Sequence, residues 1–240
     1  MVPFWDGDAH MAARLVRLLA NLEPQFSSDT EFLLVSRGGA SIGSDSLSLL
    51  RSKFTTHVHQ SLRTETGWPV GCNSVSVAGF QWILHRVCLG PSPYKAIFYC
   101  APDSCPLVRD ALSYIHRRWA SLSSRALPPY FAGALVPPGP DRPVHINSDC
   151  SILSTDAQFL SWLFKRCSEE VNNGGWDCLL AEEFRTLWGW HPLSGIRSSW
   201  QRPSFHESEW QELRDDGVSW LHGVKDQSLL MEAECKLLCS

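Results

Sequence analysis

The clearest chemical signal in the sequence is a single carboxylate, Asp103, that follows a short apolar run ending at Cys100. Pro102 precedes this aspartate and Ser104 follows it, so the apolar run ends in a polar turn. A buried strand that ends in Pro-Asp delivers a carboxylate to the edge of a sheet, which in open α/β proteins is where ligands bind. Such a carboxylate can bind Mg²⁺ or Mn²⁺, or it can cap a helix that the sequence predicts from residue 106.

A second chemically suitable group lies far downstream, in the segment His222-Gly223-Val224-Lys225. A neutral imidazole can bind Mn²⁺, a glycine permits close backbone approach, and an ammonium can neutralise a departing diphosphate. The same pattern also fits a turn at the end of a strand with a solvated lysine. We expect Asp103 and His222 to bind a metal ion and Lys225 to face an anionic ligand.

Two further segments place polar side chains at predicted element ends. Asn147 and Asp149 follow a predicted strand, where they can contact sugar hydroxyls or form an Asx turn. Asp177 follows Trp176 at a predicted helix start, where it can act as a catalytic carboxylate or as a cap. We expect Asn147, Asp149 and Asp177 at the reacting centre and Trp176 against an acceptor.

A sheet is needed to bring these residues together, and the first half of the sequence predicts one. Apolar runs predict strands at residues 2–5, 31–36, 55–59 and 95–100, and amphipathic patterns predict helices at 9–22, 77–89 and 106–122. The second half predicts strands at 130–135 and 218–222, helices at 155–171, 176–188 and 228–238, and an irregular polar segment at 196–206. A strand–helix–strand crossover implies parallel strands, so we expect an α/β fold with a central mixed, mostly parallel sheet flanked by helices.

Composition limits the possible classes of protein. The 240 residues, of which 44% are hydrophobic, suffice for one substantial core. The 21 basic and 25 acidic residues leave a net charge of −4, which excludes a global electrostatic footprint for a polyanion. The 9 cysteines include no CxxC pair, which favours reduced thiols, and no apolar run approaches the about 18 residues of a membrane span. We expect a cytoplasmic protein without membrane contact or an obligate protein partner.

Four segments, taken in order, resemble those of a small GT-A-type glycosyltransferase, an enzyme class that uses nucleotide sugars. The segments are Val2–Phe4 with Asp8, Phe98–Leu107, His145–Leu153 and Val218–Lys225. The resemblance implies one domain over residues 1–240, in which 1–105 binds a donor such as a UDP-sugar and 106–240 forms the acceptor side. The usual acidic motif of this class is Asp-x-Asp. Here Cys105 stands at the second acidic position, which leaves Asp103 as the sole carboxylate of the motif.

The resemblance also implies a reaction and a set of contacts. A hexosyl group would move from a nucleotide-diphosphate sugar to an acceptor hydroxyl, with retention of anomeric configuration as the expected outcome. Mn²⁺ or Mg²⁺ would be held by Asp103 and His222. Donor contacts are expected from Pro3, Phe4, Trp5, Arg37, Gly71, Asn73 and Lys225. If the enzyme inverts, Asp177 or Asp149 is the expected general base.

The sequence leaves the acceptor open. Small glycosyltransferases of this kind also occur in phages, where some modify hydroxymethylated bases in DNA. Arg197, Trp200 and Arg202 could form a basic, aromatic groove for such a substrate, or they could belong to a solvated loop. Two other functions stand beside sugar transfer: a catalytically silent nucleotide- or sugar-binding module, and a metal-dependent nucleotide-sugar hydrolase.

Overall fold

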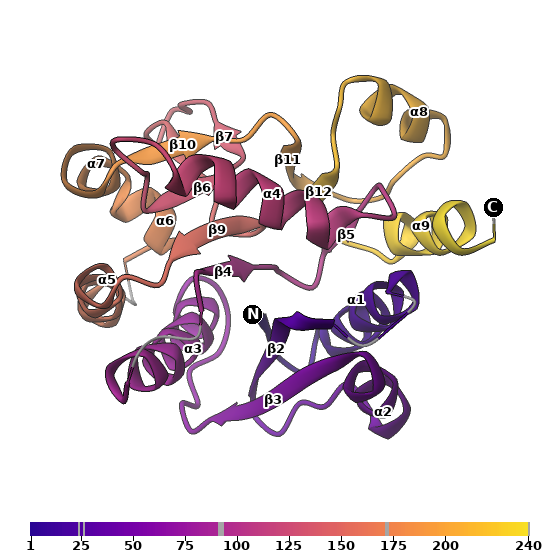
Figure 1. Ribbon diagram of the computed structural model, residues 1–240, viewed down its shortest axis with the longest axis horizontal. Coiled ribbons are helices and arrows are strands. Elements are labelled where there is room, and N and C mark those ends of the chain that lie inside the picture. The colour runs from indigo at the N-terminus through magenta and orange to yellow at the C-terminus, as the bar shows by residue number, and fades with distance from the viewer. Residues whose placement is uncertain (24, 26, 91–93, 171–172, 240) are drawn as a thin grey trace.

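The molecule is an α/β protein in which strands lie in the middle and helices pack around them (Figure 1). This computed structural model describes residues 1–240 except 24, 26, 91–93, 171–172 and 240, and it leaves the side chains of residues 200 and 201 undescribed. The α/β class predicted from the sequence is confirmed.

The first 61 residues form a strand–helix unit that is entirely parallel. Its elements are β1 (Val2–Phe4), α1 (Ala9–Leu22), β2 (Ser27–Arg37), α2 (Ser44–Lys53) and β3 (Phe54–Ser61). β2 pairs in parallel with β1 on one side and with β3 on the other. Helix α1 has the predicted bounds because Leu15, Leu18 and Leu19 recur on one face, and all three are buried.

The next part of the chain alternates short strands with longer helices. Its elements are α3 (Val70–Cys88), β4 (Ala96–Tyr99), β5 (Ser104–Pro106), α4 (Ala111–Ser123), β6 (Phe131–Gly133), β7 (Leu135–Val136), β8 (His145–Ile146), β9 (Ser151–Ser154) and α5 (Ala157–Glu169). The chain continues with α6 (Trp176–Leu179), α7 (Ala181–Glu183), the π-helical turn η1 (Phe184–Trp188), β10 (Trp190–Pro192), β11 (Ile196–Arg202), α8 (Ser208–Asp215), β12 (Trp220–Val224) and α9 (Ser228–Leu238).

Backbone hydrogen bonds join β1 to β4 and so extend the sheet into the second half of the chain. The Met1 nitrogen donates to the Phe98 carbonyl at 2.7 Å and the Cys100 amide donates to the Met1 carbonyl at 2.9 Å, which is the pattern of a parallel pair. β9 pairs antiparallel with both β4 and β6, and β10 pairs in parallel with β6. The strand order is therefore β3-β2-β1-β4-β9-β6-β10, and among these described strands only β9 runs against the others. The predicted mixed, mostly parallel sheet is confirmed.

A smaller sheet places the last strand of the protein beside the end of β4. β12 pairs in parallel with β11 and antiparallel with β5, in the register Leu221 to Cys105. Because β5 begins only a short turn after β4, it holds β12 next to that turn. A two-stranded ribbon of β7 and β8 completes the described pairings between named strands.

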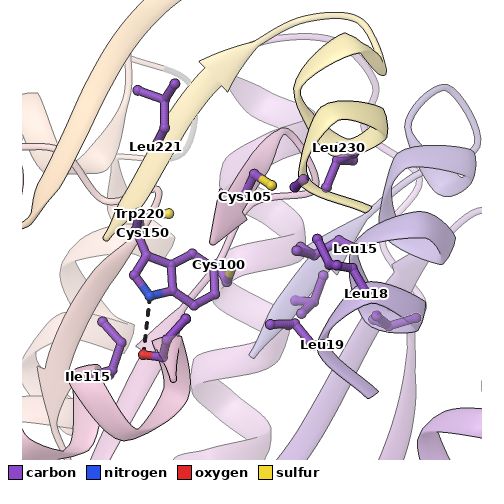
Figure 2. Packing of buried hydrophobic residues seen from close by; sticks show 14 of the residues in the cluster. Leu15, Leu18, Leu19, Cys100, Cys105, Ile115, Cys150, Trp220, Leu221 and Leu230 are labelled. Carbon is purple, nitrogen blue, oxygen red and sulfur yellow. Dashed lines mark hydrogen bonds between the residues drawn. The ribbon is translucent and has the colours of Figure 1, made fainter. Parts of the chain in front are cut away.

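The hydrophobic core ties the two ends of the chain together. Figure 2 shows Leu15 and Leu18 of α1 beside Cys105 of β5 and Leu230 of α9, with the Trp220 indole further along the same cluster. Trp220 is fully buried, and its Nε1 donates a hydrogen bond to the Ala111 carbonyl at 3.3 Å. Strand β12 therefore packs in one hydrophobic cluster with residues of α1, α4 and α9.

Several sequence predictions are wrong at the level of individual elements. The predicted helix at 106–122 begins only at Ala111, because residues 104–106 form β5 with β12 as their partner. The predicted helix at 176–188 consists of α6, α7 and η1, and the segment predicted as irregular, 196–206, contains β11. All nine cysteines lie among the described residues and are free thiols. No helix in the described part of the chain has the length and apolar character needed to cross a membrane.

Candidate active site

Strand directions explain why polar residues gather at one edge of the main sheet. The parallel strands β1, β2 and β4 end there: Arg37 is the last residue of β2, and Asp8 and Asp103 follow β1 and β4. Strand β9 runs in the opposite direction, so Asp149, two residues before its start, reaches the same edge. β5 pairs with β12 in the register Ser104 to His222, which brings the last strand to this edge as well.

Asp103 is the centre of this group of residues. Its side chain is 8% exposed, and its Oδ2 lies 2.5 Å from Lys225 Nζ while Oδ1 lies 3.3 Å from His222 Nε2. Burial alone would raise the pKa of Asp103, but the charges of His222 and Lys225 lower this pKa well below its usual range. Asp103 is therefore ionised at neutral pH. It is not a helix cap, because α4 begins at Ala111 with Asp110 at its N-cap.

One ring nitrogen of His222 contacts Ser198, and the other is directed at two carboxylates. Ser198 Oγ lies 3.1 Å from Nδ1, and the Asp103 and Asp149 oxygens each lie 3.3 Å from Nε2. Both carboxylates are within ion-pair distance, but neither has hydrogen-bond geometry, so Nε2 is a buried nitrogen without a hydrogen-bond partner among the described residues. Burial lowers the pKa of His222, and the two carboxylates outweigh it and raise the pKa overall.

These residues fit a divalent metal ion. Asp103 offers carboxylate oxygens, and Nε2 of His222, once deprotonated, offers a nitrogen donor 3.3 Å from one of them. Oxygen donors suit Mg²⁺ and Mn²⁺, and an imidazole nitrogen is an additional donor that Mn²⁺ accepts. A cation bound here would replace the proton of His222 between the imidazole nitrogen and the two carboxylates, which lie 3.3 Å from it.

Asp149 has the character of a proton acceptor. Its side chain is 29% exposed, unlike that of Asp103, and it contacts His222 at 3.3 Å. Burial raises its pKa to about 6, with His222 opposing the shift and the carboxylates of Asp103 and Asp177 adding to it. A carboxylate with this pKa is largely ionised at neutral pH but takes up a proton more readily than an ordinary aspartate.

Asp177 holds the loop that carries Asp149. Its Oδ2 accepts a hydrogen bond from the Ser148 amide at 2.8 Å, and its Oδ1 accepts one from the Cys178 amide at 2.9 Å. Asn147, on the same loop, is 2% exposed, and its Oδ1 has no hydrogen-bond partner within the described chain. Asp177 therefore positions this loop, while Asn147 keeps an acceptor oxygen available.

The predicted donor residues divide into two groups. Trp5 is 43% exposed, and the Arg37 guanidinium lies 5.4 Å from the centre of its ring. Gly71 packs against the same guanidinium, where any Cβ would overlap it. Asp8 is close by, because its Oδ1 accepts a hydrogen bond from the Trp5 amide at 2.7 Å, and burial raises its pKa to about 7. Trp5, Arg37 and Gly71 thus lie together next to the charged cluster.

The other predicted donor residues have structural roles. Pro3 and Phe4 are buried within β1, in register with Val35 and Ser36 of β2, so their side chains cannot contact a donor. Asn73 is 3% exposed, and its Nδ2 donates to the Gly174 carbonyl at 2.6 Å, which ties α3 to the segment before α6.

The predicted acceptor residues do not form one surface. Trp176 is 3% exposed and packs against the rings of Phe80 and Phe131, so the predicted acceptor contact is wrong and the ring belongs to the core. Arg197 pairs with Asp216 at 3.0 Å, and Arg202 pairs with Glu209. The side chain of Trp200 lies outside the described residues.

Sequence reasoning missed Ser198, which contacts His222, and the pocket that Ser198 lines. This pocket has a volume of about 490 Å³, and Arg118, His191 and Arg197 contribute to its walls. No local pattern marks Ser198, because its role depends on the register between β11 and β12. The neighbouring Arg197 was assigned to an acceptor groove on the strength of its charge alone.

Comparison with known proteins identifies the fold. The apo form of mouse xyloside xylosyltransferase 1 has a similar structure, with a TM-score of 0.54, 12% identity, and coverage of 95% of this chain and 97% of that one. The apo structure of the bifunctional glycosyltransferase WbbM gives a TM-score of 0.51 and 7% identity over 94% of this chain and 45% of that one. No protein-family model and no curated protein matches the sequence. The chain has a glycosyltransferase fold of the predicted GT-A-like kind.

Proposed function

We propose that this protein is a glycosyltransferase that moves a sugar from a nucleotide-diphosphate sugar to an acceptor hydroxyl. The observation that carries the proposal is the contact of Asp103 with His222 and Lys225 at the edge of the sheet. A buried carboxylate, an imidazole and an ammonium meet there although they are far apart in the chain. A diphosphate leaving group needs cations at such a position, and the fold is one that glycosyltransferases use.

The donor would lie along the edge where β1, β2 and β4 end, with residues 1–105 as its main binding surface and 106–240 as the acceptor side. The exposed ring of Trp5, backed by Arg37, offers a flat surface on which a nucleotide base can stack. From there the diphosphate would reach Lys225, whose side chain is 47% exposed and free to exchange part of its contact with Asp103.

Asp103 and His222 would hold Mn²⁺ or Mg²⁺ against the diphosphate, with Asp149 beside the same imidazole nitrogen. When bound, the ion supplies positive charge that stabilises the leaving diphosphate. Lys225 adds a second positive charge that belongs to the chain itself. Ser198 keeps the His222 ring oriented through Nδ1, which leaves Nε2 directed at the carboxylates.

In the transfer, the bond from the anomeric carbon to the phosphate oxygen breaks, and its electron pair leaves with the diphosphate. A new bond forms from the anomeric carbon to the acceptor oxygen. In a retaining reaction, which we propose, the acceptor proton passes to the leaving phosphate. In an inverting reaction the base would be Asp149, because its pKa is about 6 while both Asp177 oxygens already accept backbone hydrogen bonds.

The observations favour an acceptor other than duplex DNA. Arg197 and Arg202 are both paired with carboxylates, so a phosphate backbone would have to displace both ion pairs. The pocket of about 490 Å³ beside Ser198 has the size of a small-molecule site, and we propose it as the entry for the acceptor.

The proposal is tested by thermal unfolding of the protein with a panel of nucleotide sugars, with and without Mn²⁺. A ligand that binds the native state raises the melting temperature by mass action, so one donor should give a Mn²⁺-dependent increase. Product analysis with the same donor then separates the alternatives. Free sugar released at a rate that no acceptor changes would indicate a hydrolase, and binding without turnover would indicate a silent binding module. The absence of any shift with every donor would overturn the proposal.

A further inference from the structure

Three side chains that bind metals well lie together outside the proposed donor site. They are His145 on β8 and the consecutive residues Asp177 and Cys178 on α6. One ligand atom from each lies within 4.8 Å of the other two. A nitrogen, a sulfur and an oxygen donor in one place form a set that differs from the oxygen-rich group around Asp103, and it suits softer metal ions.

The hydrogen bonding of His145 leaves one ring nitrogen free to act as a ligand. Its Nδ1 lies 3.0 Å from the Pro143 carbonyl, and since a carbonyl oxygen only accepts, Nδ1 carries the hydrogen. Nε2 therefore carries the lone pair, which accepts a hydrogen bond from the Cys178 thiol at 3.3 Å. A backbone carbonyl that binds the far nitrogen is the usual support for a metal-binding histidine. His145 is 3% exposed, so the ring is held in this orientation by its surroundings.

The separation of the sulfur and nitrogen atoms is close to that of a tetrahedral zinc site. With a Zn–S bond of about 2.3 Å and a Zn–N bond of about 2.0 Å, tetrahedral geometry places the two ligand atoms about 3.5 Å apart. The observed separation of Sγ and Nε2 is 3.3 Å. Asp177 already accepts two backbone hydrogen bonds, but a carboxylate has about four lone-pair positions, so it can bind an ion as well. Cys178 is partly exposed, which gives an ion a route to the site.

We propose that His145, Asp177 and Cys178 form a zinc site, with a water molecule at the fourth position. Binding would replace the Cys178 S–H bond by an S–Zn bond, and the proton would be released to solvent. The ion would link β8 to α6. Because Asp177 also binds the Ser148 amide, the ion would stiffen the loop that carries Asp149. This site is separate from the Asp103 site and does not depend on the proposed transferase activity.

The test uses Zn²⁺ and Co²⁺ as probes of the metal-free, reduced full-length protein, in the presence of millimolar Mg²⁺ to occupy oxygen-rich sites. We expect one equivalent of Zn²⁺ to bind and to raise the melting temperature. Co²⁺ should give the visible bands of a tetrahedral site and a near-ultraviolet thiolate-to-cobalt transition, both removed by added Zn²⁺. Failure to bind either ion under these conditions would overturn the proposal.

Variants locate the site. Cys178→Ser should weaken Zn²⁺ binding by at least about 100-fold and remove the thiolate transition, because a hydroxyl is a poor ligand for zinc. The matched control is Cys88→Ser, which changes an exposed cysteine at the end of α3 and should leave both signals intact. Melting curves without metal show whether each variant folds. If Cys178→Ser did not fold, His145→Gln would be used in the same titration. A thiolate transition that persisted in folded Cys178→Ser, or an unchanged Co²⁺ affinity in folded His145→Gln, would contradict the assignment.

Discussion

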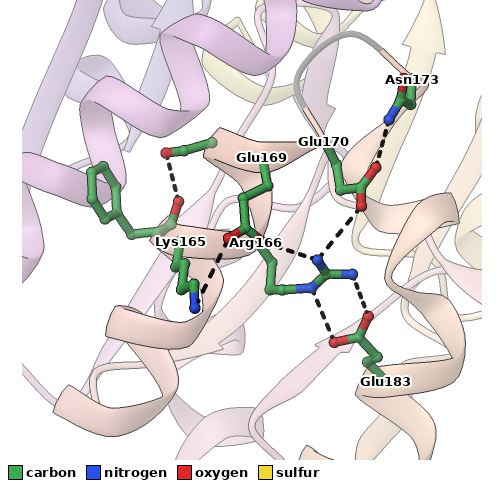
Figure 3. A network of polar contacts seen from close by, with 8 residues as sticks. Lys165, Arg166, Glu169, Glu170, Asn173 and Glu183 are labelled. Atoms are coloured by element: carbon green, nitrogen blue, oxygen red, sulfur yellow. Dashed lines mark hydrogen bonds and ion pairs between the residues drawn. The ribbon is translucent and has the colours of Figure 1, made fainter.

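Two groups of charged residues in this protein have similar compositions and different environments. On α5 and α7, Arg166 pairs with Glu183 at 2.8 Å, Glu169 at 3.0 Å and Glu170 at 3.5 Å (Figure 3). At the sheet edge, Asp103 pairs with Lys225 and His222. The Arg166 and Glu183 side chains are 29% and 31% exposed, whereas His222 and Asp103 are 1% and 8% exposed.

The two groups differ in solvent access and in whether their polar atoms have hydrogen-bond partners. In the Arg166 network, solvent reaches every charged side chain shown in Figure 3. Ion pairs of this kind contribute about 0–1 kcal/mol to stability. At the sheet edge, His222 Nε2 is buried without a hydrogen-bond partner in the described chain, and Asp149 has its pKa raised to about 6. Charges that are buried and incompletely paired indicate a binding site, and exposed, fully paired charges indicate a surface.

The largest expected effect comes from matched changes of one carboxylate in each group. Asp103→Asn should reduce sugar transfer by about 10²–10³-fold or more, because it removes a charge that fixes both His222 and Lys225. It should also destabilise the protein by about 3–5 kcal/mol, since it breaks a buried ion pair. Glu183→Gln is the control and should change stability by about 1 kcal/mol or less with unchanged turnover. For each variant, turnover is measured below its melting temperature, and the free energy of unfolding is measured separately. Equal effects of the two changes would remove the distinction between the groups.

A second pair of variants compares the lysines. Lys225→Met removes a cation from Asp103 and should lower turnover by about 10²-fold, because the leaving diphosphate loses a positive charge. It should lower stability less than Asp103→Asn does, since Asp103 keeps its contact with His222 and the lysine side chain is 47% exposed. Lys165→Met removes a lysine from the Arg166 network, where the side chain is 74% exposed, and turnover should stay the same. Steady-state kinetics with the donor found by thermal unfolding measure both. A normal rate for Lys225→Met would exclude its proposed role.

A smaller effect is expected from Ser198, which touches His222 but not the carboxylates. Ser198→Ala should weaken Mn²⁺ binding by about 10-fold, because the hydroxyl orients the imidazole. The free energy of unfolding without metal should fall by about 1 kcal/mol or less. Ser168→Ala, which removes a hydroxyl bonded to the Phe164 carbonyl on α5, serves as the control. Calorimetric titration with Mn²⁺ measures the change. Equal Mn²⁺ affinities in the two variants would mean that Ser198 only packs against the ring.

The last prediction concerns the pH dependence of stability. Burial raises the pKa of Asp8 to about 7 from 3.8, so the unfolded chain loses this proton at lower pH than the folded protein does. Between about pH 4 and pH 7 the folded state binds more protons, and this group therefore makes stability fall as the pH rises. Asp8→Asn removes the titration and should flatten that part of the curve. The test is to measure the melting temperatures of the original protein and of Asp8→Asn across this pH range. Parallel curves of melting temperature against pH would contradict the prediction.

Much of the fold could be predicted from local patterns. The leucines of α1 recur with helical spacing, and the apolar run before Cys100 marks a strand, so α1 and β4 were placed correctly. β5 has three residues and exists because it pairs with β12, more than a hundred positions away. A pattern search along the chain contains no information about that pairing, which is why a helix was predicted there.

The part of the candidate site that could be predicted consists of residues whose side-chain type alone suits them to bind a metal ion or an anion. Asp103, Asp149, His222 and Lys225 were chosen from the sequence, and the structure brings them together. Trp176 was misassigned because the rings that bury it come from other elements, among them Phe80 on α3 and Phe131 on β6. Ser198 and Cys178 were missed for the same reason, since their partners His222 and His145 are distant in the chain.

The contact between Asp103 and Lys225 joins positions that are 122 residues apart in the chain. A ribosome adds residues from the amino terminus, so β1, β2 and β4 exist before β12 has been made. During that interval the emerging chain contains Asp103 but neither His222 nor Lys225, its two partners in the folded protein. The growing polypeptide therefore completes the cluster of Asp103, His222 and Lys225 only after residue 225 has left the ribosome, and a chain that ends before β12 lacks this cluster.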